Sequence, residues 1–125
     1  MKNVCKAICI FVLIIIITLI FIFIAGWISS IAYCEYLTSQ YGYQFEDLYK
    51  ENTMLGNLFH LKVLTYHDDY AEVYYVTGNK ESGAKCGDVL SFRKENGNWI
   101  YDKWLKTVWS NHGSADGYIW PYGRW

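Results

Sequence analysis

The sequence lacks the features by which many enzymes and nucleic-acid-binding proteins are recognised. It has 11 lysines and arginines against 12 aspartates and glutamates, so no excess of positive charge indicates a nucleic-acid partner. It contains no phosphate-binding glycine loop, no HExxH motif, no dinucleotide fingerprint and no pair of catalytic carboxylates. Neither a CxxC pair nor a Cys/His cluster offers a zinc site. We therefore assign no catalytic residue, no cofactor-binding residue and no metal ligand, and expect a binding protein rather than an enzyme.

Charged residues are also absent from one long stretch of the chain. From Ala7 to Cys34, 28 residues contain no Asp, Glu, Lys or Arg. Roughly 20 apolar residues suffice to cross the hydrocarbon layer, and lipid offers the backbone no hydrogen-bond partner, so such a segment must be helical. We predict a transmembrane helix over residues 7–32. This leaves residues 35–125 for one small domain, which excludes a two-domain enzyme.

The charges that flank the apolar run are of opposite sign. Lys2 and Lys6 precede it, whereas Glu35 and Glu46 are among the first charges after it. Because the cytoplasmic flanks of membrane helices are enriched in lysine and arginine, we predict that residues 1–6 are cytoplasmic and the domain is extracytoplasmic. A cleaved secretory signal is the alternative, although its apolar core normally spans only about 7–15 residues. Both readings send the domain to the same side.

The cysteines fall on the two sides of the predicted membrane helix. Cys5 and Cys9 lie at its cytoplasmic end, and Cys34 and Cys86 lie on the outer side. Cys34 and Cys86 are therefore the candidate disulfide, which would restrict the unfolded chain by on the order of 4 kcal/mol. The alternative, two unrelated thiols, stays open.

After the apolar run, the periodicity changes from helical to strand-like. Tyr41, Phe45, Leu48 and Tyr49 follow the spacing of one helical face, which predicts a separate helix over about residues 43–51. Four runs rich in β-branched and aromatic residues follow, at about residues 58–66, 70–77, 88–95 and 98–109. This order predicts an α+β domain in which one helix packs on a four-stranded antiparallel meander. The architecture resembles the cystatin-like and nuclear-transport-factor-like classes.

The turn between the last two predicted strands carries the clearest local signal. Asn and Gly at positions 96 and 97 tolerate the positive φ angles that a two-residue type I′ turn requires. Such a turn sets Phe92 opposite Tyr101 and Leu90 opposite Lys103. We expect the face that carries Phe92 and Tyr101 to be covered by the predicted helix.

Aromatic residues crowd the end of the chain. The candidate binding surface consists of Trp109, Tyr118, Trp120, Tyr122 and Trp125. Pro121 excludes a helix, so in an extended tail Tyr118, Trp120 and Tyr122 would project to one side. Such a row could stack on sugar rings of a cell-wall polymer, dock another membrane protein, or lie among lipid headgroups. Alternatively, the rings close a domain that is too small to bury its sheet without them.

Two alternative functions remain at this stage. The residue types of a catalytic triad occur close together, at Ser110, His112, Ser114 and Asp116. Residues two apart in one loop do not converge, so turn hydrogen bonds explain them better, but a small hydrolase or ligand-processing domain with His60 or His112 as base stays an alternative. The other alternative is a toxin-immunity or signalling accessory, in which the membrane helix meets a partner at Thr18 and Gly26.

The segment from residue 96 to 125 resembles the C-terminal part of small, uncharacterised, membrane-anchored or secreted proteins of Gram-positive bacteria. The resemblance covers roughly a quarter of the chain. It rests on a Gly-x-Trp strand start and the strings TVWS, SADG and IWPY, that is, on Gly97, Trp99, Thr107, Val108, Trp109, Ser110, Ser114, Ala115, Asp116, Gly117, Ile119, Trp120, Pro121 and Tyr122. It implies a bacterial envelope habitat and no particular activity. We therefore expect a single-pass binding or scaffolding module at the cell membrane, with the lipid bilayer and a cell-wall polymer or another membrane protein as partners.

Overall fold

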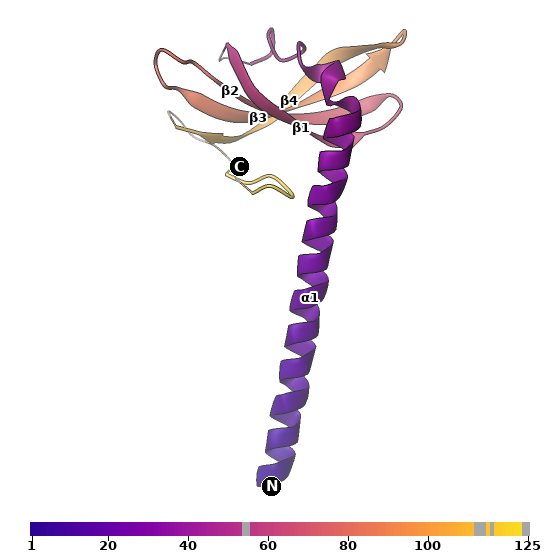
Figure 1. The fold of residues 1–125 in the computed structure, drawn as a ribbon, viewed down its shortest axis with the longest axis vertical. Coiled ribbons are helices and arrows are strands. Elements are labelled where there is room, and N and C mark those ends of the chain that lie inside the picture. The colour runs from indigo at the N-terminus through magenta and orange to yellow at the C-terminus, as the bar shows by residue number, and fades with distance from the viewer. Residues whose placement is uncertain (54–55, 112–114, 116, 124–125) are drawn as a thin grey trace.

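The computed structural model describes residues 1–53, 56–111, 115 and 117–123. Within these residues the elements are α1 (Lys2–Tyr41), the short 3-10 helix η1 (Gly42–Phe45), β1 (Asn57–Tyr66), β2 (Tyr70–Gly78), β3 (Lys85–Glu95) and β4 (Asn98–Ser110). The strands form an antiparallel sheet in the order β1-β2-β3-β4. Figure 1 shows α1 as a long stalk with the sheet at its C-terminal end. The predicted α+β architecture is confirmed.

The helix α1 contains the whole apolar run. It is continuous for 40 residues, which corresponds to a length of about 60 Å. It is long and apolar enough to cross a membrane, and the segment that qualifies is not buried by the rest of the protein. The helix continues beyond the predicted end at residue 32 because its last turns pack on the sheet, where Cys34 and Leu37 are buried.

The separate helix predicted over residues 43–51 does not form. After Tyr41 the chain continues through η1 and a series of turns. The periodic aromatic residues pack on strand side chains instead: Tyr41 stacks on the Tyr66 ring at 3.8 Å, and Phe45 meets the same ring at 6.4 Å, edge to face. Tyr49 lies on the Tyr75 ring, with 5.9 Å between the ring centres. A Cβ on Gly42 would lie 3.3 Å from a β1 side chain, so the chain crosses the sheet closely at this point. The helix that packs on the sheet is therefore the end of α1 itself.

The β3–β4 hairpin confirms the predicted turn and part of the predicted register. Residues 96 and 97 have φ angles of 50° and 81°, as a type I′ turn requires. Phe92 pairs with Tyr101 as expected. The predicted pair of Leu90 with Lys103 is wrong, because the register shifts between residues 91 and 92 and Leu90 pairs with Trp104.

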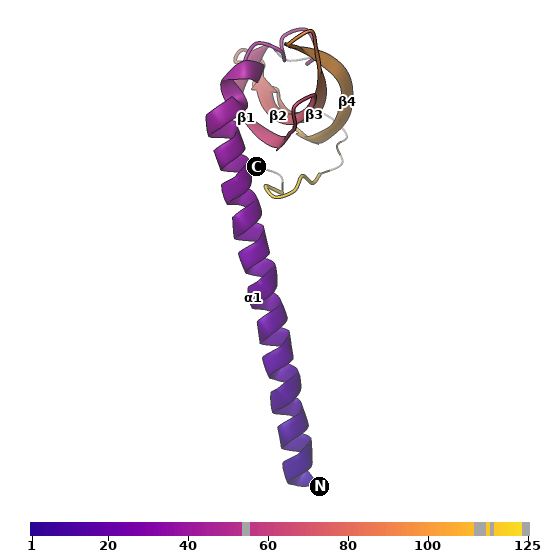
Figure 2. The same ribbon diagram turned by 90° about the vertical axis from the view of Figure 1, so that its right-hand side faces the viewer.

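Irregular pairing along both edge strands bends the sheet. The β3–β4 ladder shifts at three places and the β1–β2 ladder at two. An extra residue on one strand lengthens that strand locally and increases its bend and twist. The sheet therefore curves around the segment that follows α1, as Figure 2 shows, and the C-terminal segment lies on its convex side near α1.

The curved sheet buries side chains on both faces. On the concave face, side chains of α1 and the following segment pack on strand residues to form one core, which comprises Leu37, Phe45, Tyr49, Leu61, Val63, Ala71, Val73, Tyr75, Leu90 and Phe92. On the convex face, the second core comprises Tyr74, Val76, Val89, Val108 and Ile119. Phe45 lies 5.3 Å from the Phe92 ring, so η1 rather than a second α-helix covers the Phe92 part of the predicted aromatic face. The expectation is wrong for Tyr101, which stays 38% exposed.

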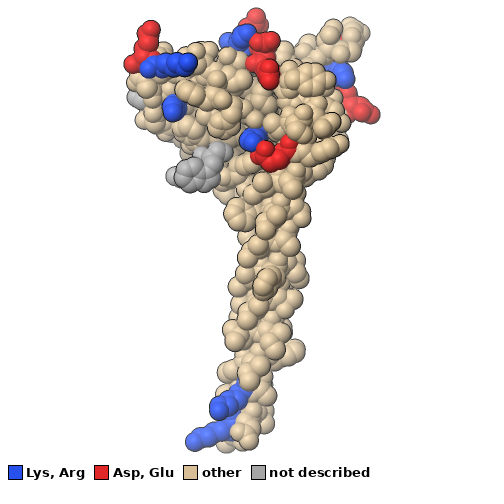
Figure 3. All heavy atoms as spheres, viewed as in Figure 1, with Lys and Arg blue, Asp and Glu red and all other residues tan. Residues whose placement is uncertain are grey.

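The charges divide between the two ends of the molecule. Figure 3 shows lysine or arginine side chains at the N-terminal tip of the stalk, an uncharged middle, and charges of both signs on the sheet domain. The sequence places the lysines of the tip at positions 2 and 6. This distribution is the one that a helix embedded in lipid between two aqueous layers requires.

Candidate functional site

The end of α1 is bound to the edge of β1 by two hydrogen bonds. The Val63 amide donates to Thr38 Oγ1 at 2.9 Å, and Cys34 Sγ donates to the Leu64 carbonyl at 3.8 Å. An edge strand otherwise leaves a row of backbone groups without a partner in the sheet. The polar side chains at the end of α1 thus fix the domain to the helix.

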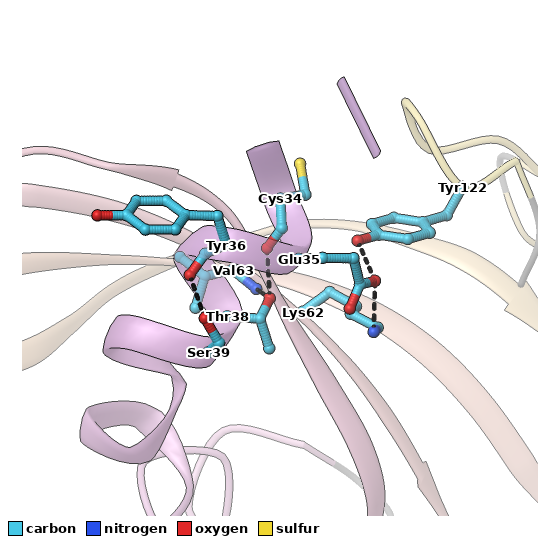
Figure 4. A network of polar contacts seen from close by, with 8 residues as sticks. All are labelled: Cys34, Glu35, Tyr36, Thr38, Ser39, Lys62, Val63 and Tyr122. Atoms are coloured by element: carbon cyan, nitrogen blue, oxygen red, sulfur yellow. Dashed lines mark hydrogen bonds and ion pairs between the residues drawn. The ribbon is translucent and has the colours of Figure 1, made fainter. Parts of the chain in front are cut away.

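Glu35 links α1 to β1 and to the C-terminal segment (Figure 4). Its Oε1 accepts hydrogen bonds from Lys62 Nζ at 2.6 Å and from the Tyr122 hydroxyl at 2.7 Å. The hydrogen bond from Lys62 lowers the pKa of the Glu35 carboxyl, which partial burial opposes and the Tyr122 bond reinforces. Burial and the bond to Glu35 raise the pKa of the Tyr122 hydroxyl, so this group stays protonated and donates. We call Glu35, Lys62 and Tyr122 the Glu35 joint.

The backbone near the end of the chain is not extended as predicted. Residues 119–123 make a tight turn, in which the backbones of Ile119 and Gly123 exchange hydrogen bonds of 2.7 and 2.6 Å. The prediction of an extended tail is therefore wrong, although Tyr118, Trp120 and Tyr122 all line one notch beside α1.

The four described residues of the predicted binding surface differ in their contacts and exposure. Trp109 is half-buried and donates from Nε1 to the hydroxyl of Tyr74 at 2.6 Å. Tyr122 belongs to the Glu35 joint, and Trp125 lies outside the described residues. Tyr118 and Trp120 keep large exposed fractions, 53% and 44%. The structure therefore uses Trp109 and Tyr122 to hold the C-terminal part of the domain together, and Tyr118 and Trp120 are available to a partner.

The turn at residues 119–123 contacts α1 inside the charge-free run. The Trp120 ring lies edge to face on the Phe23 ring, with their centres 6.3 Å apart. The Trp27 indole donates from Nε1 to the Pro121 carbonyl at 2.7 Å. The C-terminal segment is thus attached to the helix well below the level of Glu35.

A second exposed aromatic surface lies on the concave face of β4. Tyr101 and Trp104 pair with Phe92 and Leu90, which lie two residues apart on one face of β3, so the two rings are neighbours on the same face. Tyr101 is 38% and Trp104 51% exposed. Both rings extend the concave face beyond the part that Phe45 covers.

Asp88 orients the Trp104 ring by a hydrogen bond. This buried carboxylate accepts hydrogen bonds from Trp104 Nε1 at 3.4 Å, from Thr107 Oγ1 at 2.6 Å and from Cys86 Sγ at 3.2 Å. Bonds from several directions satisfy the carboxylate and orient the indole. We call Tyr101, Trp104 and Asp88 the aromatic platform.

The candidate disulfide between Cys34 and Cys86 is not formed. All four cysteines of the chain lie in its described part and are free thiols. Cys34 is hydrogen bonded to a β1 carbonyl, and Cys86 to Asp88 beneath the platform. Burial raises the pKa of the Cys86 thiol to about 11, so this group is protonated at neutral pH and is not a reactive thiolate. The two cysteines serve separate packing roles, which is the alternative that the sequence left open.

Of the two bases proposed for the alternative hydrolase, His60 is the one that the structure describes. His60 lines an open hollow of about 510 Å³ between β1 and the segment after α1. Burial lowers the pKa of its imidazole, and Lys62 lowers it further. The ring lies against Tyr74, 6.4 Å between centres, and His112 lies outside the described residues. Within the described residues, no group of three or more His, Cys, Asp and Glu side chains could hold a metal ion.

Sequence reasoning missed the aromatic platform. The register from the Asn-Gly turn places Lys103 opposite Leu90, which removes Trp104 from the face of Phe92 and Leu90. To recognise the platform, one must know where the pairing register between β3 and β4 shifts. The content of β-branched and aromatic residues does not reveal the positions of such shifts. Asp88 is the first residue of the predicted third strand, and only the longer β3 of the structure places this carboxylate inside a strand, where burial calls for a partner.

Comparison with known proteins gives no match: no family model, no curated protein and no solved structure matches this chain. The chain is therefore assigned by its own architecture, an α+β domain carried on a helix able to cross a membrane.

Proposed function

We propose that the protein is a single-pass membrane protein at the bacterial cell envelope, which carries a binding module outside the membrane and its N-terminus in the cytoplasm. The uncharged helix, the lysines before it and the acidic residues after it support this orientation. The hydrogen bonds from the Val63 amide to Thr38 and from Lys62 to Glu35 fix α1 to β1, and they hold the module directly at the end of the helix.

The aromatic platform is the binding surface of this proposed module. The observation that carries the proposal is an exposed indole whose ring is fixed by a hydrogen bond to a buried carboxylate. A ring held in one orientation loses little conformational entropy when a ligand stacks on it. The platform lies on the concave face, and Figure 1 shows the C-terminal segment on the opposite side of the sheet, nearer the N-terminal part of α1. A ligand above the membrane surface can therefore reach it.

The ligand that the platform favours is a saccharide polymer of the cell envelope. Two neighbouring aromatic faces suit stacking on the apolar faces of sugar rings, and each ring has a polar edge for hydrogen bonding. Another membrane protein is the competing partner, because tyrosine and tryptophan are also the residues that anchor protein interfaces.

The proposal is tested with the full-length protein in nanodiscs and insoluble cell-wall material from a Gram-positive bacterium. We expect co-sedimentation of the wild type and a loss of about 2 kcal/mol, or about 30-fold in Kd, for Trp104→Ala. Tyr101→Ala is the second platform variant. Its matched control is Tyr43→Ala, which removes an exposed tyrosine of η1.

Equal binding of the wild type and both platform variants would rule out the platform. A photo-crosslinker at position 104 provides the second arm. Specific crosslinking to a membrane protein in cells, without binding to cell walls, would replace the polymer by a protein as the ligand.

A further inference from the structure

The turn at residues 117–123, which we call the C-terminal loop, is held at a defined height along α1. Two contacts fix it there, the Trp120 ring on Phe23 and the hydrogen bond from Trp27 to the Pro121 carbonyl. The two helix residues lie four positions apart, on one face of α1. The loop therefore cannot move along the helix without losing both contacts.

This height corresponds to the outer boundary of the hydrocarbon layer. About 20 helical residues cross that layer, so within the predicted membrane segment, residues 7–32, the part from Ala7 to about Gly26 lies in the hydrocarbon and the last residues lie in the interfacial layer. Phe23 then lies roughly 5 Å inside the layer, at 1.5 Å per residue, and Trp27 lies at its boundary. The C-terminal loop, which touches both, lies at the same level.

The exposed side chains of the loop suit this level. Tyr118 and Trp120 are about half exposed, whereas Ile119 between them is buried in the convex core. Rings with an apolar body and a polar edge are enriched where hydrocarbon meets headgroups. In water these two rings would leave apolar surface exposed without compensation.

Two further features fit contact with lipid. An open notch of about 270 Å³ lies between the loop and α1, lined by Phe23, Trp27, Trp120 and Pro121 among others. At this depth, acyl chains are the groups that would fill an apolar notch. Lys106 donates to the Tyr118 carbonyl at 2.8 Å, which places a cation beside the loop, at the level where the phosphate groups of lipid headgroups would lie.

We propose that the C-terminal loop is a second membrane contact, in which Tyr118 and Trp120 insert into the outer interfacial layer of the bilayer that α1 spans. The inference rests on the membrane anchoring in the proposed function. With the helix and the loop both engaged, the domain has two points of attachment and a fixed tilt. The convex face is then turned to the membrane and the aromatic platform away from it.

Tryptophan fluorescence in nanodiscs tests this inference on the full-length protein. Lipids brominated in the upper part of the acyl chain quench indoles at that depth. We expect the intensity lost to bromine to fall in Trp120→Phe, because one lipid-facing emitter is removed while a ring remains on Phe23. In the matched control Trp104→Phe, an emitter far from the bilayer is removed, so the intensity lost to bromine stays unchanged.

A charge at the loop provides a second readout. Tyr118→Asp places a carboxylate in the interfacial layer, so we expect the loop to lift and the emission of Trp120 to shift to longer wavelength. An unchanged bromine effect in Trp120→Phe, or an unchanged emission in Tyr118→Asp, would overturn the loop contact alone. If the wild type showed no quenching and did not float with vesicles, the membrane anchoring itself would fail.

Discussion

The hydrogen bond from the Val63 amide to Thr38 Oγ1 allows the junction between α1 and the sheet to be measured. Valine has the shape of threonine without the hydroxyl, so Thr38→Val removes the acceptor and leaves the packing volume unchanged. Val63 is fully buried, so its amide would lose its 2.9 Å partner in a place that water does not reach. A buried polar group without a partner costs about 1–3 kcal/mol.

This cost should appear as a lower unfolding temperature of the sheet domain. For a domain of this size, 1 kcal/mol corresponds to a shift of about 4–8 °C. We expect Thr38→Val to lower the Tm by at least about 4 °C, as followed by near-ultraviolet circular dichroism of the full-length protein in detergent micelles. The variant also removes the hydrogen bond from Thr38 Oγ1 to the Cys34 carbonyl, at 2.7 Å. Hydrogen exchange of the Val63 amide should accelerate at the same time, because this amide loses its acceptor.

Thr38→Ser is the matched control, since serine keeps the hydroxyl and lacks only the methyl group. We expect it to retain the protection of the Val63 amide. If Thr38→Val unfolded at the wild-type temperature and kept this amide protected, the Thr38 hydroxyl would not be the hydrogen-bond partner that stabilises the Val63 amide.

Three further changes test other parts of the structure. In Gly87→Ala, a Cβ would lie 2.6 Å from Trp109 Nε1, so we expect a loss of about 1–3 kcal/mol in urea unfolding. Phe45→Ala empties a fully buried site against the concave face and should cost about 3–5 kcal/mol in the same assay. The hydrogen bond from Lys62 lowers the pKa of Glu35, so the ionised carboxylate stabilises the folded state above the ordinary pKa of 4.5, and this stabilisation is lost as the pH falls below that value. Glu35→Gln should therefore flatten the decrease of Tm in this acidic range.

Each of these variants has a control in the same chain. Gly56→Ala adds a Cβ that meets nothing within 4 Å, so equal losses at Gly56 and Gly87 would exclude the steric explanation. Phe59→Ala removes a partly exposed ring and should cost less than Phe45→Ala. Glu46→Gln changes an exposed carboxylate, and a Tm profile flattened as much as that of Glu35→Gln would argue against the Glu35 joint.

The sequence alone determined the features that depend on near neighbours. The charge-free run predicted where the long helix lies, because backbone groups in lipid must be satisfied within the segment itself. Alternating β-branched and aromatic residues predicted four strands, and the Asn-Gly pair predicted both the turn and the pairing of Phe92 with Tyr101. Local chain geometry decides each of these, so a short window of sequence contains the information.

The tertiary structure decided how distant segments meet. Tyr41 and Phe45 have the spacing of one helical face, but the chain around Phe45 does not form a second α-helix. Both rings pack on Tyr66, and this tertiary contact outweighs the local preference for a helix. The register shifts that bring Trp104 over Asp88 depend on the fit of whole strands, not on one turn. The loop that places Trp120 on Phe23 joins residues at opposite ends of the chain, and only the folded sheet between them brings those ends together.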